Sequence, residues 1–94
     1  MIEWTEEATR QLDLAHDYIA FSNSEDVADG VIMRIVNSVE RLDRFPFSGR
    51  QGRVPNTREL VVPHTPFIVA YKVHRARVVI LALYHGAQRW PESF

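Results

Sequence analysis

The run of residues from Val78 to Leu83 constrains the fold more than any other part of the sequence, because every side chain in it is apolar. Successive side chains of a strand point to opposite faces of the sheet. The two expected sets are Val78, Ile80 and Ala82 on one face, and Val79, Leu81 and Leu83 on the other. A strand that is apolar on both faces belongs inside a sheet that is covered on both sides.

Two amphipathic helices are expected to cover one face. Thr5 and Ser24 are each followed by two acidic residues, which is typical of a helix start. The first predicted helix covers residues 6 to 20, and the second runs from 25 to Phe45-Pro46, because the residue before a proline disfavours helical backbone. The short connection predicts an antiparallel helical hairpin, in which Gly30 is expected at a close approach of the helices.

The apolar residues of both predicted helices recur at intervals of three or four, so each helix has one apolar stripe. The stripes are Ala8, Leu12, Ala15 and Ile19 in the first helix, and Ala28, Val31, Ile32, Ile35, Val39 and Leu42 in the second. The second face of the sheet must then meet either the C-terminal segment or another protein.

The other predicted elements are strands. Ile2–Trp4 is a short first strand, and residues 46 to 57 form a turn-rich segment. Three β-rich runs follow at residues 58 to 62, 67 to 73 and 77 to 84, with His74-Arg75-Ala76 joining the last two as a hairpin. The sequence therefore predicts an α+β fold of order β-α-α-β-β-β, in which the helical hairpin packs on a twisted, mainly antiparallel sheet.

Length and composition limit the remaining possibilities. A chain of 94 residues can stabilise one core, so we expect a single domain spanning residues 1–94. Cysteine is absent and the four histidines lack the spacing of a metal-binding helix, so we expect no metal and no cofactor. No apolar stretch approaches the roughly 20 residues of a membrane span, and no signal peptide is recognisable, which predicts a cytoplasmic protein with no membrane contact.

Charge is distributed unevenly along the chain. Residues 1–30 contain eight acidic residues and one arginine, whereas residues 31–94 contain ten basic and four acidic residues. Two interpretations are open: a basic face for an anionic or acidic partner, or charges solvated on opposite sides of an ordinary domain. The acidic first helix argues against a helix-turn-helix DNA-binding protein, because phosphates would repel it.

The segment after the central strand contains the candidate site. His85, Arg89 and Trp90 lie just beyond the strand, and Arg58 and Lys72 are expected on neighbouring strands. Together they would form a cationic pocket in which His85 transfers a proton during phosphodiester cleavage. The alternative is structural, with Trp90 packed on the core and His85 in a hydrogen bond, and the chemistry alone favours this alternative.

The order and spacing of these segments resemble the RelE/ParE superfamily of bacterial toxins over essentially the whole chain. The segments that carry the resemblance are the helical hairpin, Phe45-Pro46 through Gly49-Arg50, Arg58-Glu59-Leu60, Phe67 to Val73, and Val78 to His85. The resemblance implies the toxin of a type II toxin-antitoxin system, which a cognate antitoxin binds in a hetero-oligomer. It does not identify the antitoxin-binding residues.

The superfamily contains two activities, which imply different partners. RelE-type toxins cut messenger RNA on the ribosome, usually with an arginine where Ile68 stands, a second arginine near Gln88 and a terminal tyrosine where Phe94 stands. His85 matches a histidine that some ribosome-dependent relatives use in catalysis. ParE-type toxins lack the catalytic set and bind DNA gyrase.

The departures from the RelE pattern favour a ParE-like toxin that is not an enzyme. Its expected target-binding residues are Arg89, Trp90, Pro91 and Phe94. Two alternatives stay open. One is a RelE-like endoribonuclease, with the candidate catalytic residues His85, Arg89, Arg58 and Lys72; the other is a non-toxic module that retains only antitoxin binding.

Overall fold

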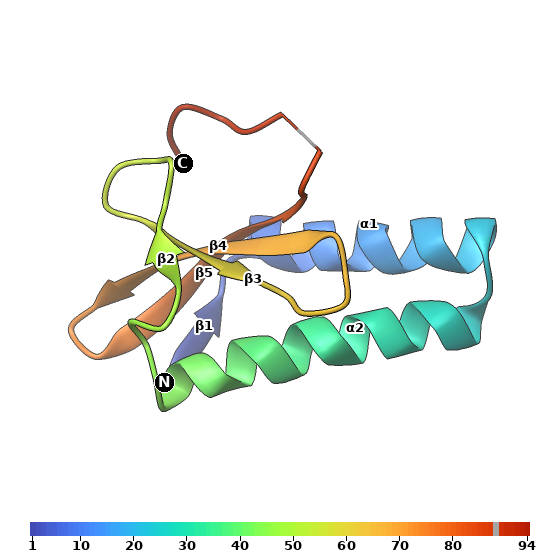
Figure 1. The fold of residues 1–94 in the computed structure, drawn as a ribbon, viewed down its shortest axis with the longest axis horizontal. Coiled ribbons are helices and arrows are strands. Elements are labelled where there is room, and N and C mark those ends of the chain that lie inside the picture. The colour runs from blue at the N-terminus through green and yellow to red at the C-terminus, as the bar shows by residue number, and fades with distance from the viewer. Residues whose placement is uncertain (88) are drawn as a thin grey trace.

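The strands form one mixed sheet, and the helices pair alongside it (Figure 1). The computed structural model describes residues 1–87 and 89–94. In chain order, the elements are β1 (Ile2–Trp4), α1 (Glu6–Ser22), α2 (Glu25–Glu40), the 3-10 turn η1 (Arg41–Asp43), β2 (Arg50–Gln51), β3 (Arg58–Val61), β4 (Phe67–His74) and β5 (Arg77–His85). The sheet order is β1-β5-β4-β3-β2, with β1 parallel to β5 and all other neighbours antiparallel. The predicted α+β fold is confirmed.

Both helices begin where the sequence predicts. The Thr5 and Ser24 side chains accept hydrogen bonds from the backbone N–H groups of Ala8 and Val27, which satisfies donors that the first helical turn leaves unpaired. The predicted end of the second helix is wrong, because α2 stops at Glu40. The backbone then tightens into η1, which places Leu42 in the core before Pro46 requires a non-helical conformation.

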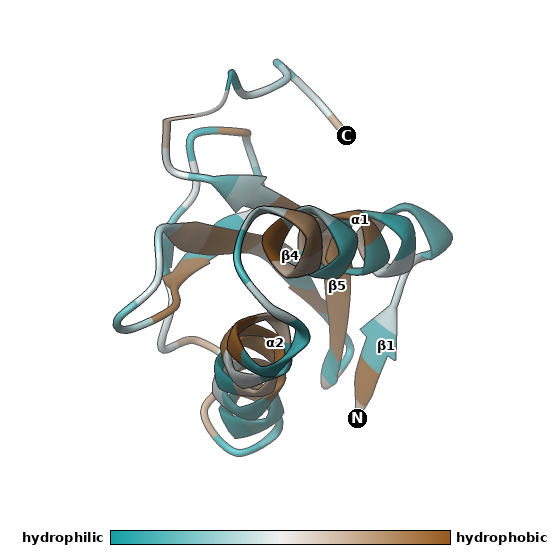
Figure 2. Cartoon of the chain, turned by 90° about the vertical axis from the view of Figure 1, so that its right-hand side faces the viewer, coloured by the Kyte–Doolittle hydropathy of each residue, from teal (hydrophilic) through white to brown (hydrophobic). Residues whose placement is uncertain are grey.

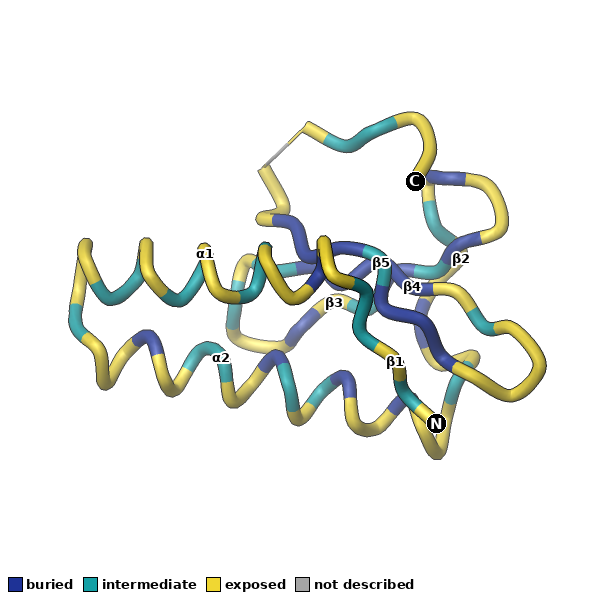
Figure 3. Tube along the Cα trace, turned by 180° about the vertical axis from the view of Figure 1, so that it is seen from behind, coloured by how far each residue is buried: buried dark blue, intermediate teal, exposed yellow. Residues whose placement is uncertain are grey.

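The helices cover one face of the sheet, as predicted. Viewed along the helix axes, the hydrophobic side of α2 turns toward α1 and the sheet (Figure 2). Ile35, Val39 and Leu42 join Val69 and Tyr71 in one fully buried cluster. Buried residues are concentrated in β4 and β5, whereas the far end of the helical hairpin extends beyond the sheet and is largely exposed (Figure 3). No helix within residues 1–87 and 89–94 is long and apolar enough to cross a bilayer.

The predicted alternation of side chains along β5 is wrong beyond Ile80. Ala70 of β4 lies opposite Ala82, but the next residue, Tyr71, lies opposite Ile80. Leu81 is therefore an extra residue, a β-bulge, and it reverses the order of inward and outward side chains. Val78, Ile80 and Leu83 contact the helix-side core, while Ala82 and Tyr84 lie in a second cluster on the other face.

The C-terminal segment covers that second face. It is one of the two alternatives expected from the sequence, the other being another protein. Trp90 packs against the cluster of Ala70, Ala82 and Tyr84. The Tyr84 and Trp90 rings lie 4.6 Å apart between centroids, in a tilted arrangement. Both faces of β5 are therefore covered by the chain itself.

Two further expectations need correction. The predicted loop at residues 46 to 57 contains β2, which pairs with the first two residues of β3. Gly30 does not mark a close approach of the helices, because a Cβ atom built there would have no heavy atom within 4 Å. The hairpin between β4 and β5 is present, but its predicted connection is one residue too long, because His74 belongs to β4 and pairs with Arg77. Its two turn residues, Arg75 and Ala76, have φ angles of 50° and 66°. Two positive φ angles define a turn whose twist matches the flanking strands.

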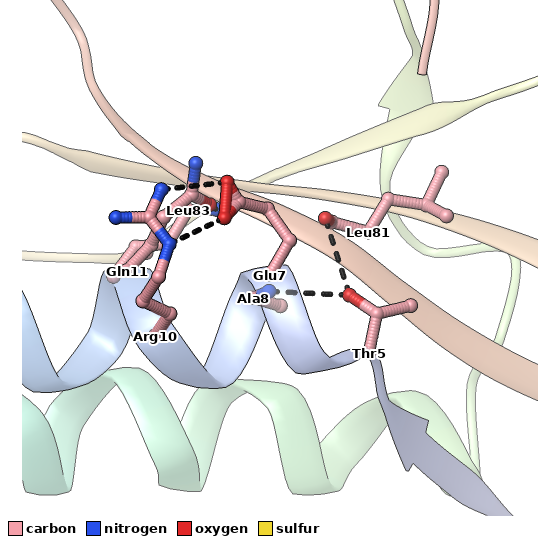
Figure 4. A network of polar contacts seen from close by, with 7 residues as sticks. All are labelled: Thr5, Glu7, Ala8, Arg10, Gln11, Leu81 and Leu83. Carbon is pink, nitrogen blue, oxygen red and sulfur yellow. Dashed lines mark hydrogen bonds and ion pairs between the residues drawn. The ribbon is translucent and has the colours of Figure 1, made fainter.

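The start of α1 completes the edge of β5 beyond the last residue of β1 (Figure 4). The Thr5 hydroxyl lies 2.8 Å from the Ile80 carbonyl and 3.3 Å from the Leu81 carbonyl, at the bulge. The Gln11 side-chain oxygen accepts a hydrogen bond of 2.8 Å from the Leu83 amide. Thr5 therefore both caps α1 and fixes the backbone where β5 changes its alternation.

We expect Thr5→Val to lower the free energy of unfolding by about 1–2 kcal/mol, because it removes the helix cap and the hydrogen bonds of the hydroxyl to the carbonyls at the bulge. Thr5→Ser retains the hydroxyl and is the matched control, with a loss below about 0.5 kcal/mol. Urea unfolding followed by circular dichroism measures both. A loss in Thr5→Val no larger than that in Thr5→Ser would contradict the role assigned to the hydroxyl.

Candidate functional site

His85 lies at the end of β5, on the side of the sheet that faces α1. Its ring makes an edge-on contact with Phe67, with 5.9 Å between the centroids. Its Nδ1 atom accepts a hydrogen bond of 3.2 Å from the Ala87 amide. The hydrogen bond that the structural alternative assigned to His85 is therefore present.

Arg58 and Lys72 lie together at a different part of the sheet. With Phe47, Gln51, Asn56, Thr57 and Val73, they line an open depression of about 510 Å³. Arg58 Nη1 donates to the backbone carbonyls of Phe47 and Gly49, at 3.2 and 2.9 Å. These bonds fix the guanidinium group at the rim of the depression.

The structure does not bring His85 together with these two cations. His85 pairs with Phe67, whereas Arg58 pairs with Tyr71, four residues further along β4. At about 3.3 Å per residue, this separates the two positions by about 13 Å along the strand. Lys72, one residue beyond Tyr71, is further away still. The strand register therefore places His85 and this depression at different parts of the sheet.

The predicted target-binding residues lie on the segment that crosses the helix-free face. Trp90 is half-buried on Tyr84, and Phe94 reaches the same ring at 6.2 Å between centroids, although 49% of Phe94 is exposed. Arg89 is exposed and Pro91 is half-buried. Gln88, near the expected position of a family arginine, lies outside the described residues.

Arg53 holds this segment against the sheet. Its guanidinium carbon lies 4.0 Å from the centroid of the Trp90 ring, within the range of a cation–π interaction. The same guanidinium forms an ion pair of 3.3 Å with Glu59 of β3. The Trp90 Nε1 atom is buried and has no hydrogen-bond partner among the described residues. The indole is therefore held by ring contacts.

Glu59 is a buried carboxylate held between two arginines. Only 3% of its surface is exposed, and Arg50 donates to Oε1 while the Arg53 backbone amide donates to Oε2. Burial acts to raise the pKa of Glu59, but the hydrogen bonds from Arg53 and Arg50 and their charges outweigh it, so the pKa is lowered from its ordinary value. The carboxylate therefore stays charged and ties the turn before β3 to the sheet.

Tyr71 secures the other side of this turn. Its fully buried ring places the hydroxyl 2.9 Å from both the Gly49 amide, which donates to it, and the Pro46 carbonyl, which accepts from it. A Cβ atom on Gly49 would lie 2.5 Å from that hydroxyl, which explains the glycine. Burial raises the pKa of Tyr71, partly offset by the hydrogen bond from Gly49.

Arg53, Glu59 and Tyr71 were not predicted from the sequence as determinants of the site. A signal for Glu59 was present, since it is the sole acidic residue between Asp43 and Glu92 and lies close to three arginines. An isolated acid among arginines favours an ion-paired position over a solvated one. The contact of Arg53 with Trp90 had no such signal, because it joins segments that only the fold brings together.

A groove of about 480 Å³ separates α1 from the end of the sheet. It is lined by Arg10, Gln11, Leu14, Ala15, Tyr18, Phe67, Leu83 and His85. Large apolar side chains continue from this groove along α1, with exposed fractions of 52% for Leu14, 72% for Tyr18 and 93% for Phe21. Exposed apolar side chains next to a groove are typical of an interaction site.

Comparison with known proteins agrees with this architecture. The sequence model for the ParE toxin of the type II toxin-antitoxin system parDE matches residues 2–90. The chain belongs to the ParE toxin family. A candidate toxin of Sinorhizobium fredii, Y4kP, is 42% identical over 91 residues, which is 97% of this chain and 93% of that protein. These findings confirm the resemblance and its ParE-like side.

The fold of this ParE toxin matches that of a solved structure, the chromosomal ParDE toxin-antitoxin system from P. aeruginosa. The two have a TM-score of 0.82 and 26% sequence identity. The match covers 89% of this chain and 92% of that one. The helical hairpin and five-stranded sheet are thus the family's architecture.

We expect Glu59→Gln to destabilise this ParE toxin by about 2 kcal/mol at pH 7, because the hydrogen bonds to a charged acceptor are lost. A lowered pKa means that the charge stabilises the fold fully above the ordinary value of 4.5 and that this contribution is lost as the pH falls through the folded-state pKa. The stability difference between wild type and variant should therefore be constant from about pH 7 to 5 and shrink below 4.5.

Urea unfolding at several pH values measures this difference. Glu40→Gln, which neutralises an exposed carboxylate at the end of α2, is the control and should change stability by less than about 0.5 kcal/mol. A Glu59→Gln difference that grew on acidification would contradict the assigned role of the carboxylate.

Proposed function

We propose that this ParE toxin arrests growth by binding DNA gyrase in the cytoplasm, and that a cognate antitoxin neutralises it in a hetero-oligomer. The observation that carries a binding mechanism is the separation of His85 from Arg58 and Lys72 by about 13 Å or more along the sheet. General acid–base catalysis on a phosphodiester would need these groups around one phosphate. Membership of the ParE family supports the toxin role.

The proposed gyrase contact is the C-terminal segment with Arg89, Trp90, Pro91 and Phe94. Arg89 and Phe94 are exposed. Trp90 anchors the segment through Tyr84 and Arg53. Arginine and aromatic side chains on a rigid support are the residues that most often dominate binding energy at protein interfaces. The contact surface is thus preorganised by the fold of the sheet.

The proposed antitoxin contact is the groove beside α1 and the apolar stripe of Leu14, Tyr18 and Phe21. An amphipathic helix or a strand of the antitoxin can cover such a surface through its apolar side chains. This surface faces away from the C-terminal segment across β5. Antitoxin binding and gyrase binding therefore use separate residues and can be tested separately.

We expect the purified toxin to inhibit supercoiling by DNA gyrase, and the antitoxin encoded beside it to relieve that inhibition.

The double variant Arg89→Ala, Phe94→Ala should weaken inhibition roughly tenfold or more, since it removes two expected hot-spot side chains. His85→Ala should inhibit within about twofold of wild type. Tyr18→Asp should inhibit normally but resist relief by antitoxin, because it places a charge in the apolar contact.

Supercoiling unaffected by wild-type toxin would reject gyrase as the target. Messenger RNA cleavage on ribosomes that His85→Ala abolishes would then establish the endoribonuclease alternative. Normal growth during strong expression of the toxin alone would favour the remaining alternative, a non-toxic module that retains only antitoxin binding. Each variant is first compared with wild type by thermal unfolding, so that loss of fold is not mistaken for loss of contact.

A further inference from the structure

The depression that contains Arg58 and Lys72 has no role in the proposed gyrase or antitoxin contacts. Its lining includes two cations, the side-chain amides of Gln51 and Asn56, the Thr57 hydroxyl and the ring of Phe47. No carboxylate is part of this lining. In the part of the chain that the structure describes, neither Arg58 nor Lys72 forms an ion pair. The depression is therefore positively charged and not neutralised from within.

The two cations differ in how they are held. Arg58 uses Nη1 for two backbone carbonyls and lies over the Phe47 ring, with its guanidinium carbon 5.0 Å from the centroid. No other nitrogen of Arg58 has a protein acceptor among the described residues, so these donors remain for an anion. Lys72 is exposed and adds a second charge to the lining from the adjacent strand. Two cations that line one depression, one of them with its guanidinium fixed, are suited to a phosphate.

The Phe47 ring in this depression distinguishes single-stranded nucleic acid from other anionic partners. Phe47 is 63% exposed, and the Arg58 guanidinium lies over its ring. A ring with one open face next to two cations provides a stacking surface for an unpaired base whose phosphate contacts the cations. An acidic peptide would use the cations but not the stacking surface. A duplex would not offer an unpaired base to the ring.

The charges beyond the depression extend in one direction. Arg75 lies beyond Lys72, in the hairpin turn. Its guanidinium group continues the cationic surface toward the tip of the β4–β5 hairpin. Glu92 lines a second depression, which also borders Lys72.

We infer that the depression formed by Phe47, Arg58 and Lys72 is a binding site for single-stranded nucleic acid, in which Phe47 stacks on a base and the two cations hold the adjacent phosphate. The site binds the strand without cutting it, because His85 is remote from the phosphate. This inference does not depend on gyrase being the target. It also gives Arg58 and Lys72 a role that needs no catalytic histidine.

Fluorescence anisotropy with a labelled single-stranded 12-mer of DNA tests the site in the full-length toxin. We expect Lys72→Gln and Arg58→Gln each to weaken binding roughly fivefold to tenfold, and to reduce the slope of log affinity against log salt by about 0.7 per lost phosphate contact. Phe47→Ala should weaken binding by at least about fivefold, through loss of stacking. Arg34→Gln, which removes an equal charge from the exposed surface of α2, should stay within twofold.

Lys72 is exposed, so its replacement leaves the fold intact and isolates the effect of the charge. Weaker binding of a duplex of the same length, and recovery of the 12-mer uncut, would support the site. Equal weakening by Arg34→Gln would show non-specific attraction and overturn the inference. Binding of a polyglutamate peptide that matched the 12-mer in affinity would overturn it in favour of an acidic peptide.

Discussion

Burial of β5 on both faces is the constraint on which the other parts of this structure depend. The helical hairpin covers one face and the C-terminal segment covers the other. The bulge at Leu81 divides the strand between these two covers, because it turns Leu83 toward the helices and leaves Ala82 and Tyr84 for Trp90. Thr5 fixes the bulge at the start of α1, so the helices and the C-terminal cover are positioned by one short stretch of backbone.

The same arrangement explains how a chain of 94 residues presents several surfaces without a large core. Glu59 binds Arg50 and Arg53, and Arg53 in turn lies on Trp90. Only the carboxylate end of these ion pairs is buried, because the Arg50 and Arg53 side chains are about half exposed. Their effect here is geometric: they tie the turn before β3 to the C-terminal segment and thereby fix both the depression beside Phe47 and the segment with Arg89.

Most of the fold could be predicted from the sequence because its signals are local. Caps at Thr5 and Ser24, apolar stripes with helical spacing and β-rich runs each depend on residues close together in the chain. The bulge could not be predicted, since Leu81 differs from its neighbours only in its pairing with β4. Nor could the sequence place Arg53 on Trp90 or separate His85 from Arg58, because these relations are set by strand register. The structure thus groups the candidate residues differently from the prediction, with His85 apart from Arg58 and Lys72.

The covering of the sheet by Trp90 is the central claim, and fluorescence quenching tests it most directly. Trp4→Phe leaves Trp90 as the one tryptophan in the chain. Acrylamide should quench this fluorophore weakly in the folded protein, and strong quenching should appear at the same urea concentration at which circular dichroism reports unfolding. Quenching in the folded protein as strong as in urea would contradict the account, since Trp90 would then not pack on Tyr84 and the second face of β5 would lack its cover.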